Sequence, residues 1–200
     1  SPFHAIAESE RRLKEQGFQK LILGEAWSVA PGNSYYVNLY GSSLIAFSIG
    51  ANAKKGEKAP VFRMAASHTD WPCLRIKPTP EMTKDGYGLL NVECYGGMLL
   101  QTWFDRPLSI AGRICLRGQD AFHPTERLID FKRPLLMVPN LANHIKRESE
   151  KNAEPNKQTD MLPIIAAFRD SLPDENFFLG LLAQEAGVSR SDILDYELYI

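Results

Sequence analysis

The sequence of 200 residues carries little net charge and no long apolar run. Its 23 Lys and Arg residues balance 24 Asp and Glu residues, which leaves a formal net charge of −1. A nucleic-acid-binding domain needs a concentrated basic face, so we expect no nucleic-acid partner. No uninterrupted apolar segment reaches the length of about 20 residues that crosses a bilayer, so we expect no membrane partner.

Several familiar catalytic motifs are also missing. The sequence contains no Gly-x-Ser-x-Gly elbow, no P-loop and no Gly-x-Gly-x-x-Gly fingerprint. The three cysteines, Cys73, Cys94 and Cys115, are widely spaced and form no Cys-x-x-Cys pair. This spacing argues against a zinc ribbon or a thioredoxin-type site. It is typical of reduced, partly buried thiols in a cytoplasmic protein.

The overall composition is that of an ordinary globular protein, with 44% hydrophobic and 24% charged residues. Two hundred residues suffice for one large domain or two small ones. The chain begins at Ser1 without an initiator Met and stops at Ile200 inside an alternating, strand-like run. We therefore expect a piece of a longer protein.

The pattern of apolar residues predicts an α/β segment over residues 1–78, followed by a β-rich segment with two or three short helices. Pro78 and Pro80 indicate a hinge or crossover between these two segments. The expected elements are a capped helix from Ser1 to about Gly17, a hairpin of strands 35–40 and 43–49, a central strand 61–68, strand-rich runs 87–104 and 108–118, a strand leading into a short helix near Pro139 or Asn140, a mobile loop 146–160, a helix over 174–188 that stops at Gly187, and a strand 191–200.

His68 is the first residue that could carry chemistry. It ends the predicted strand 61–68, and Asp70 follows two residues later. A histidine at a strand end is a common zinc ligand, and a nearby carboxylate can accept its second ring N–H and fix its tautomer. The spacing alone also fits a hydrogen-bonded core histidine, because His-x-Asp is a weak pattern.

Two further sites leave similar alternatives open. Asp105 and Arg106 lie between aromatic residues and a proline, and they could form a surface ion pair or a folded-in pair at a domain junction or subunit contact. His144 could interact with the dipole at the end of a short helix, or it could bind an anion or polarise a substrate. His4 and His123 have weaker cases as functional residues.

Six segments resemble the M18 family of metalloaminopeptidases, the aspartyl aminopeptidases, in order along the whole chain. They are SPFHAIAE, SSLIAFSIG, SHTDWPCLRIKP, VECYGGMLLQTWFDRPLSIAGR, RPLLMVPNLANHI and DILDYELY. The resemblance implies the N-terminal part of an α/β, zinc-peptidase-type catalytic domain with an inserted β-rich dimerisation domain. On this basis we assign residues 1–80 to the catalytic domain. Residues 81–200 are assigned to the dimerisation domain, with their end leading back to the catalytic domain.

The same resemblance implies a function. Members use two metal ions, usually Zn²⁺ although other divalent metals are possible, to activate a water that cleaves the N-terminal residue from a peptide. They assemble from dimers into tetrahedral dodecamers. His68 matches a metal-binding histidine, Asp70 the carboxylate that orients it, and His144 a histidine that reaches the substrate site of a neighbouring subunit. Phe104, Asp105 and Arg106 match a Phe-Asp-Arg stretch of the family.

The chain also departs from the family pattern. Trp71 stands where a small residue is usual, Pro107 where an acid is usual, and Met98 where a third glycine is usual. The bridging Asp, the paired glutamates, a further carboxylate and the last His of the family do not occur in these 200 residues. We therefore expect this chain alone to be inactive.

Three functions fit these observations. The first is an aminopeptidase that prefers acidic N-terminal residues, and the second is a neutral or leucine-preferring aminopeptidase of the same family. The third is a non-catalytic assembly fragment. An acidic preference would require a cationic or hydrogen-bonding pocket for the first side chain, and these 200 residues do not reveal one.

Overall fold

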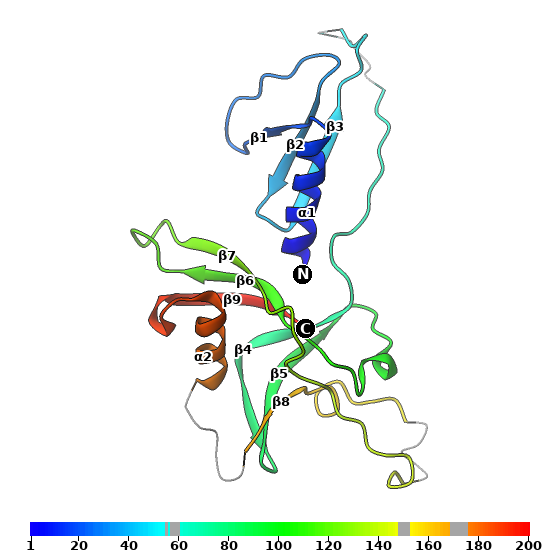
Figure 1. The fold of residues 1–200 in the computed structure, drawn as a ribbon. Coiled ribbons are helices and arrows are strands. Elements are labelled where there is room, and N and C mark those ends of the chain that lie inside the picture. The colour runs from blue at the N-terminus through cyan, green and yellow to red at the C-terminus, as the bar shows by residue number, and fades with distance from the viewer. Residues whose placement is uncertain (55, 57–60, 148–152, 169–175) are drawn as a thin grey trace. The chain divides into compact units, whose positions relative to one another are not determined.

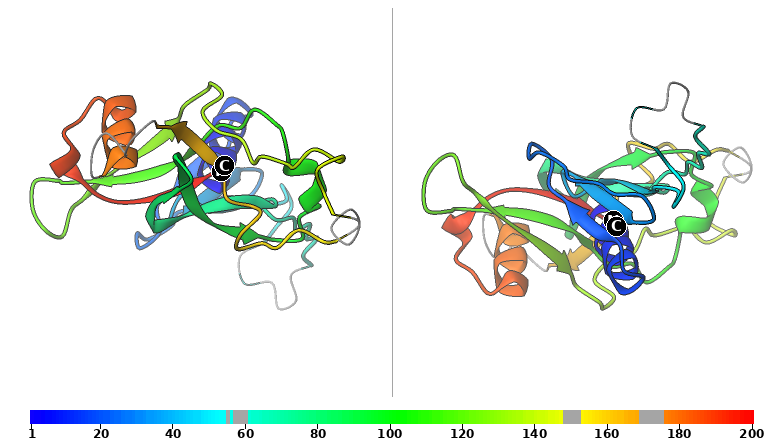
Figure 2. Two further views of the ribbon diagram at one scale, coloured as in Figure 1. Left: turned by 90° about the horizontal axis from the view of Figure 1, so that it is seen from below. Right: turned by 90° about the horizontal axis from the view of Figure 1, so that it is seen from above.

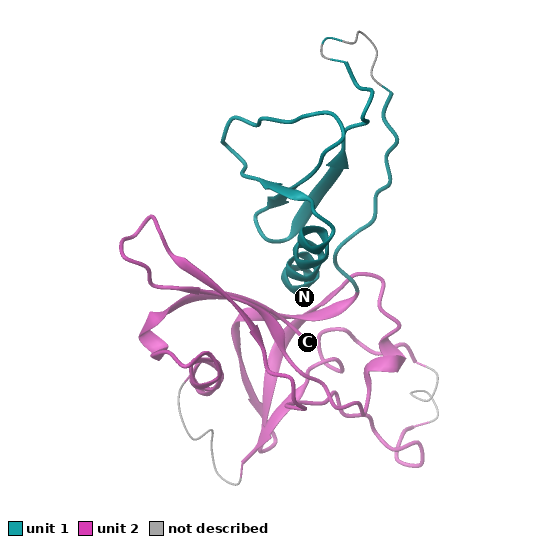
Figure 3. Cartoon of the chain, turned by 45° about the horizontal axis from the view of Figure 1, so that its top comes forward, with its two compact units in different colours: residues 1–71 teal, residues 72–200 magenta. Residues whose placement is uncertain are grey.

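The computed structural model describes residues 1–54, 56, 61–147, 153–168 and 176–200. Within them the chain forms two compact units, residues 1–71 and residues 72–200 (Figure 3). Each unit contains its own sheet, and together they give the mixed α/β fold expected from the sequence (Figure 1). The assignment of residues 1–80 and 81–200 to catalytic and dimerisation domains stays a prediction.

The first unit begins with helix α1, Pro2–Glu15. The Ser1 side chain accepts a hydrogen bond from the His4 main-chain N–H, and Pro2 occupies the first turn, where its missing N–H costs nothing. The predicted helix start is therefore confirmed. Phe3 and Ile6 are buried, on the side of α1 that contacts β2 and β3.

A three-stranded sheet completes the first unit. Strand β1, Gln19–Leu21, pairs in parallel with β2, Ser34–Leu39, and β2 pairs antiparallel with β3, Ser43–Ser48. This confirms the predicted hairpin. Tyr40 and Gly41 both have positive φ angles, 56° and 75°, and the Asn38 side chain accepts a hydrogen bond from Gly41 N at 2.7 Å.

The predicted central strand 61–68 is wrong. The segment has no ladder partner among the described residues, and Val61, Phe62 and Met64 are 75–92% exposed. Its apolar composition suits a buried strand, but a strand also requires a neighbouring strand for its N–H and C=O groups. Five residues of the preceding polar loop, 55 and 57–60, lie outside the described residues.

The second unit is built on a six-stranded antiparallel sheet, seen from three sides in Figures 1 and 2. The strand order is β7-β6-β9-β4-β5-β8. The strand bounds are Cys73–Lys84 for β4, Tyr87–Tyr95 for β5, Ala111–Leu116 for β6, Thr125–Asp130 for β7, Ile164–Ala167 for β8 and Ile193–Tyr199 for β9. β9 confirms the strand predicted at the end of the chain, and it lies between β6 and β4.

One apolar face of this sheet forms the core of the second unit. The fully buried side chains come from β4, β5, β6, β9, helix α2 (Phe177–Ala186) and the connecting segments: Leu74, Leu90, Ile110, Ile114, Val138, Met161, Phe178, Leu182 and Leu198. In the described part of the unit, the 3₁₀ turns η1 over Leu100–Trp103 and η3 over Arg190–Asp192 connect elements around it. The segment that contains Val138 is therefore anchored in the core just before the chain reaches His144.

The hinge predicted at Pro78 and Pro80 is replaced by an irregularity inside β4. Ile76 pairs with Val92 of β5, but Glu81 pairs with Leu90, so the β4 side contains extra residues. A bulge accommodates proline because the residues in it need not donate to the ladder. The strand therefore continues through both prolines instead of ending at them.

Helix α2, Phe177–Ala186, confirms the helix predicted over 174–188 and packs beside β4 (Figures 1 and 2). Gly187 ends it with a φ of 64°, as the sequence indicated. The Glu81 carboxylate accepts a hydrogen bond from Phe178 N at the start of the helix. The acidic residues predicted there, Asp174 and Glu175, lie outside the described residues. Among the residues described, no helix combines the length and apolar character that crossing a bilayer requires.

The helix predicted after Pro139 is wrong. Residues 143–145 form a single turn, in which Ile145 N and Lys146 N donate to Ala142 O at 2.9 and 3.2 Å. One turn without further i→i−4 bonds does not propagate into a helix. Of the predicted mobile loop 146–160, residues 148–152 lie outside the described part. Residues 156–160 form a turn in which Asp160 N donates to Asn156 O at 2.9 Å.

Candidate functional site

His68 lies in an exposed segment of the first unit, and its ring is oriented by Asp70. Its Nδ1 atom lies 2.5 Å from the main-chain oxygen of Asp70 and 3.4 Å from the Asp70 carboxylate. Both partners accept hydrogen bonds, so Nδ1 carries the proton and Nε2 keeps its lone pair. This is the tautomer that can bind a metal ion through Nε2. The main-chain oxygen of Asp70 lies closer to Nδ1 than the Asp70 carboxylate does, although the sequence had indicated the carboxylate as the orienting group.

Thr69 fixes this segment to the β2–β3 hairpin. Its hydroxyl donates a hydrogen bond to the main-chain oxygen of Ser42 at 2.9 Å. Sequence reasoning missed Thr69, because the contact joins residues 27 positions apart and has no local signature. The hairpin turn therefore helps to set the position of the imidazole next to it.

A complete metal site does not occur in the described part of the chain. No group of three or more His, Cys, Asp or Glu residues there could hold a metal ion together. The His68 side chain is 80% exposed, so its Nε2 atom is open to a ligand. A zinc site needs three or four protein ligands, and these residues therefore fit the role of one ligand and its orienting group.

His144 is exposed and lies in the turn over residues 143–145 of the second unit. Because no helix forms there, an interaction with a helix dipole is not the role of this histidine. An exposed turn leaves the imidazole available to a group from outside the unit.

Asp105 and Arg106 make separate contacts, so the surface ion pair, one of the two alternatives that the sequence left open, does not form. The Asp105 carboxylate accepts a hydrogen bond from Asn140 N at 3.0 Å, and Asp105 N donates to Val138 O at 2.8 Å. The Arg106 guanidinium donates to the main-chain oxygen of Thr102 at 2.5 Å. Asp105 thus connects to the segment that leads to His144.

The other histidines are explained by local structure. His4 Nδ1 lies 2.8 Å from the Ser1 hydroxyl at the start of α1. His123 Nδ1 lies 2.8 Å from the Asp120 carboxylate in the loop between β6 and β7. The His123 hydrogen bond, together with one from Phe122 N, lowers the pKa of Asp120.

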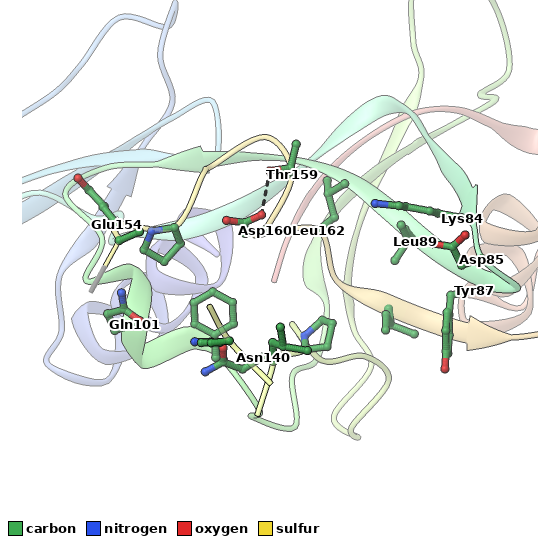
Figure 4. Close-up of a pocket in the computed structure, with 17 residues that line it drawn as sticks. Lys84, Asp85, Tyr87, Leu89, Gln101, Asn140, Glu154, Thr159, Asp160 and Leu162 are labelled. Carbon is green, nitrogen blue, oxygen red and sulfur yellow. Dashed lines mark hydrogen bonds between the residues drawn. The ribbon is translucent and has the colours of Figure 1, made fainter. Parts of the chain in front are cut away.

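A cavity of about 790 Å³ lies within the second unit, between the β4–β5 turn and the segments around residues 140 and 160 (Figure 4). Leu89 and Leu162 contribute apolar surface, and the Asp160 carboxylate accepts a hydrogen bond from Thr159 at 2.9 Å. Charged groups of both signs line it, including Lys84 and Asp85.

A family model described as aminopeptidase I zinc metalloprotease (M18) matches residues 1–200 of this chain. The chain belongs to the M18 aminopeptidase family. This confirms the resemblance that the sequence motifs indicated.

Curated relatives extend the M18 assignment. "Probable M18 family aminopeptidase 2" of Clostridium acetobutylicum is 41% identical over 203 residues, which cover 100% of this chain and 46% of that protein. The protein of the same name from Pseudomonas fluorescens strain SBW25 is 43% identical over 203 residues, covering 99% of this chain and 46% of that protein. The chain therefore spans about half the length of the curated relatives it matches.

Solved M18 structures share the fold along the whole chain. Ape4, in its complex with Nbr1, superposes with a TM-score of 0.88 at 35% identity, covering 100% of this chain and 41% of that one. Chaetomium thermophilum mApe1 gives a TM-score of 0.86 at 30% identity, covering 100% and 47%. The mixed α/β arrangement described above is thus that of M18 aminopeptidases.

Proposed function

We propose that the protein containing this chain is a zinc-dependent aminopeptidase that removes the N-terminal residue of peptides. The match of the M18 family model to residues 1–200 carries this proposal. The orientation of His68, with Nε2 left as an acceptor, supports it from the structure. The relatives named above are themselves named aminopeptidases.

His68 would bind one zinc ion through Nε2, and the main chain and carboxylate of Asp70 would hold its Nδ1 proton. In the complete enzyme we expect two ions per site, with the remaining ligands and the general base outside this chain. Other divalent metals could take the same positions. Bound zinc supplies a coordinated water of lowered pKa that can attack a peptide carbonyl.

Within this proposal, the preferred N-terminal residue is acidic, Asp or Glu, as the family resemblance implies. One observation favours the neutral or leucine-preferring alternative. Trp71 is 51% exposed and directly follows Asp70, where the family usually has a small residue. A large apolar surface beside the site would favour an apolar first side chain over a carboxylate.

The proposal extends to assembly. Residues 81–200 would form the dimerisation domain inserted in the catalytic domain, and His144 would reach the substrate site of a neighbouring subunit. The exposed turn around His144 supports such a role. Dimers would assemble into tetrahedral dodecamers. A structure of S. cerevisiae mApe1 is a dodecamer, but at 23% identity and a TM-score of 0.72 it shows only the shared fold.

We also place the protein in the cytoplasm. In the described residues Cys73, Cys94 and Cys115 form no disulfide, and Cys73 is buried. Burial raises the pKa of the Cys94 thiol, which keeps it in its less reactive protonated form. Reduced, protected thiols suit a reducing compartment.

The test is an assay of the full-length protein, loaded with zinc, on substrates with N-terminal Asp, Glu and Leu. We expect cleavage by the full-length protein, no cleavage by residues 1–200 alone, and loss of both cleavage and bound zinc in His68→Ala. His123→Ala is the matched control, because His123 is 78% exposed and also bonded to an aspartate. If the zinc-loaded full-length protein cleaves none of these substrates, the chain is an assembly fragment and the proposal is wrong.

A further inference from the structure

Asp105 connects two segments that lie 35 positions apart. Its main-chain N donates to Val138 O at 2.8 Å, and its carboxylate accepts from Asn140 N at 3.0 Å. Phe104 and Val138 are paired in an isolated parallel bridge next to these bonds. One residue thus binds the chain on both sides of Pro139, where a proline ring supplies no donor.

The backbone of Asp105 is adapted to this contact. Its φ angle is 56°, in the left-handed region that most L-residues avoid but Asp and Asn tolerate. A conformation of this kind persists where surrounding contacts hold it. The Arg106 bond to Thr102 O and the two bonds to residues 138 and 140 provide such contacts.

The bond to Asn140 lies at the boundary between core and exposed chain. Val138 is fully buried, whereas residues 140–145 are exposed. The described hydrogen bonds within residues 141–146 join these residues only to one another. The position of His144, four residues beyond Asn140, therefore depends on how firmly Asn140 is held.

We propose that Asp105 is a positioning residue that holds the His144 turn in place for the active site of a neighbouring subunit. This inference rests on the proposed function of His144. Displacement of a catalytic element by about 1 Å can cost on the order of 100-fold in rate, so one anchoring hydrogen bond can matter to activity.

Two substitutions distinguish the role of the Asp105 side chain from that of its backbone conformation. Asp105→Asn and Asp105→Gly both tolerate the positive φ, but only Asn keeps an oxygen that accepts from Asn140 N. In the full-length, zinc-loaded enzyme we expect kcat/KM to fall about tenfold or more in Asp105→Gly and to stay within about threefold of the native value in Asp105→Asn. Amide hydrogen exchange over residues 139–147 should accelerate only in Asp105→Gly. Equal effects of both variants, or unchanged exchange in Asp105→Gly, would overturn the proposal.

Mixed oligomers test whether Asp105 acts through His144. A residue that positions the donated histidine should restore activity when Asp105→Gly subunits are mixed with His68→Ala subunits, and not when they are mixed with His144→Ala subunits. Restoration with His144→Ala subunits would show that Asp105 serves a different element. If His68→Ala and His144→Ala subunits fail to complement each other, the action of His144 in trans is wrong. The double variant Asp105→Gly/His144→Ala tests whether Asp105 acts only through His144. If its activity is lower than that of His144→Ala alone, Asp105 has another role and the positioning role is overturned.

Discussion

The hydroxyl of Tyr196 on β9 donates to the main-chain oxygen of Lys77 on β4 at 3.0 Å, and it lies 3.3 Å from the oxygen of Pro78. These oxygens lie in the irregular part of β4, between Ile76 and Glu81, where the ladder to β5 shifts register. The tyrosine thus supplies a hydrogen bond that the interrupted ladder does not. It also packs edge-on against Phe178 of α2, with ring centroids 5.8 Å apart.

Removal of this hydroxyl should destabilise the second unit. We expect Tyr196→Phe to lower the free energy of unfolding by about 1–2 kcal/mol, because the main-chain acceptors lose their partner while the ring packing is kept. Urea denaturation of the chain measures the change. Tyr87→Phe is the control, since Tyr87 is an exposed residue at the start of β5 and its change should fall within about 0.5 kcal/mol. Equal effects of the two variants would contradict the role of the Tyr196 bond.

The same hydroxyl predicts a pH dependence of stability. Burial, followed by the charges of Asp195 and Glu81, raises the pKa of Tyr196 to about 12 from an ordinary value of 10.0. The folded state therefore holds this proton more tightly than the unfolded state. The resulting stabilisation is present below pH 10 and is lost as the pH rises towards 12. The stability difference between the native chain and Tyr196→Phe, followed from pH 9 to 12, should shrink with rising pH. A constant difference would show that the hydroxyl does not titrate in this way.

Glu197 is the centre of a charged row across three strands. Its carboxylate contacts Arg75 of β4 at 3.1 Å and Arg113 of β6 at 3.5 Å, and it accepts from the Tyr199 hydroxyl at 2.6 Å. We expect Glu197→Gln to cost about 0.5–1.5 kcal/mol, since the group is partly exposed, and to cost less in 1 M NaCl. Glu126 contacts Arg113 and is more exposed than Glu197, so Glu126→Gln should cost less than Glu197→Gln in the same unfolding assay. A Glu197→Gln effect that salt leaves unchanged would contradict an electrostatic origin.

Gly112 allows β6 and β9 to approach each other. A methyl group at this position would collide with the main chain of Glu197 and Leu198, which cannot move without breaking the ladder. We expect Gly112→Ala to destabilise the chain by about 3 kcal/mol, at the upper end of the usual cost of overpacking. Gly97→Ala is the control, because a Cβ there meets nothing within 4 Å. Similar midpoints of thermal unfolding for both variants would show that the strands can separate at no cost.

Trp71 should influence which N-terminal residue the full-length enzyme prefers. We expect Trp71→Ser to raise the ratio of kcat/KM for Asp to that for Leu substrates by several-fold, because an apolar contact contributes about 1–3 kcal/mol to discrimination. Trp27→Ser provides a control with a second exposed tryptophan of the same unit. An unchanged ratio in Trp71→Ser would place Trp71 away from the substrate.

The sequence predicted best those features whose causes are local. The Ser1-Pro2 start of α1, the turn at Gly41 and the stop of α2 at Gly187 each depend on residues within one turn of the chain. These signals come from capping and backbone conformation, so they can be read without tertiary structure.

The predictions that were wrong concern features that depend on contacts between distant parts of the chain. Residues 61–68 have the composition of a strand, but no neighbouring strand among the described residues pairs with them. Pro78 and Pro80 predicted a hinge from their local effect on the backbone. The strand continues through them in a bulge that is supported by Tyr196, more than a hundred positions away, and this contact cannot be read from the local sequence. His68 was found through its motif, whereas the bonds of Thr69 to Ser42 and of Asp105 to Asn140 join distant positions and could not be predicted.

The bond from Thr69 to Ser42 constrains the length of the β2–β3 hairpin. Most surface hairpins tolerate added residues at their tips. An insertion between Leu39 and Ser43 would instead move the main-chain oxygen of Ser42, which accepts the hydrogen bond from Thr69. The length of this short hairpin connection therefore affects where the neighbouring His68 imidazole lies.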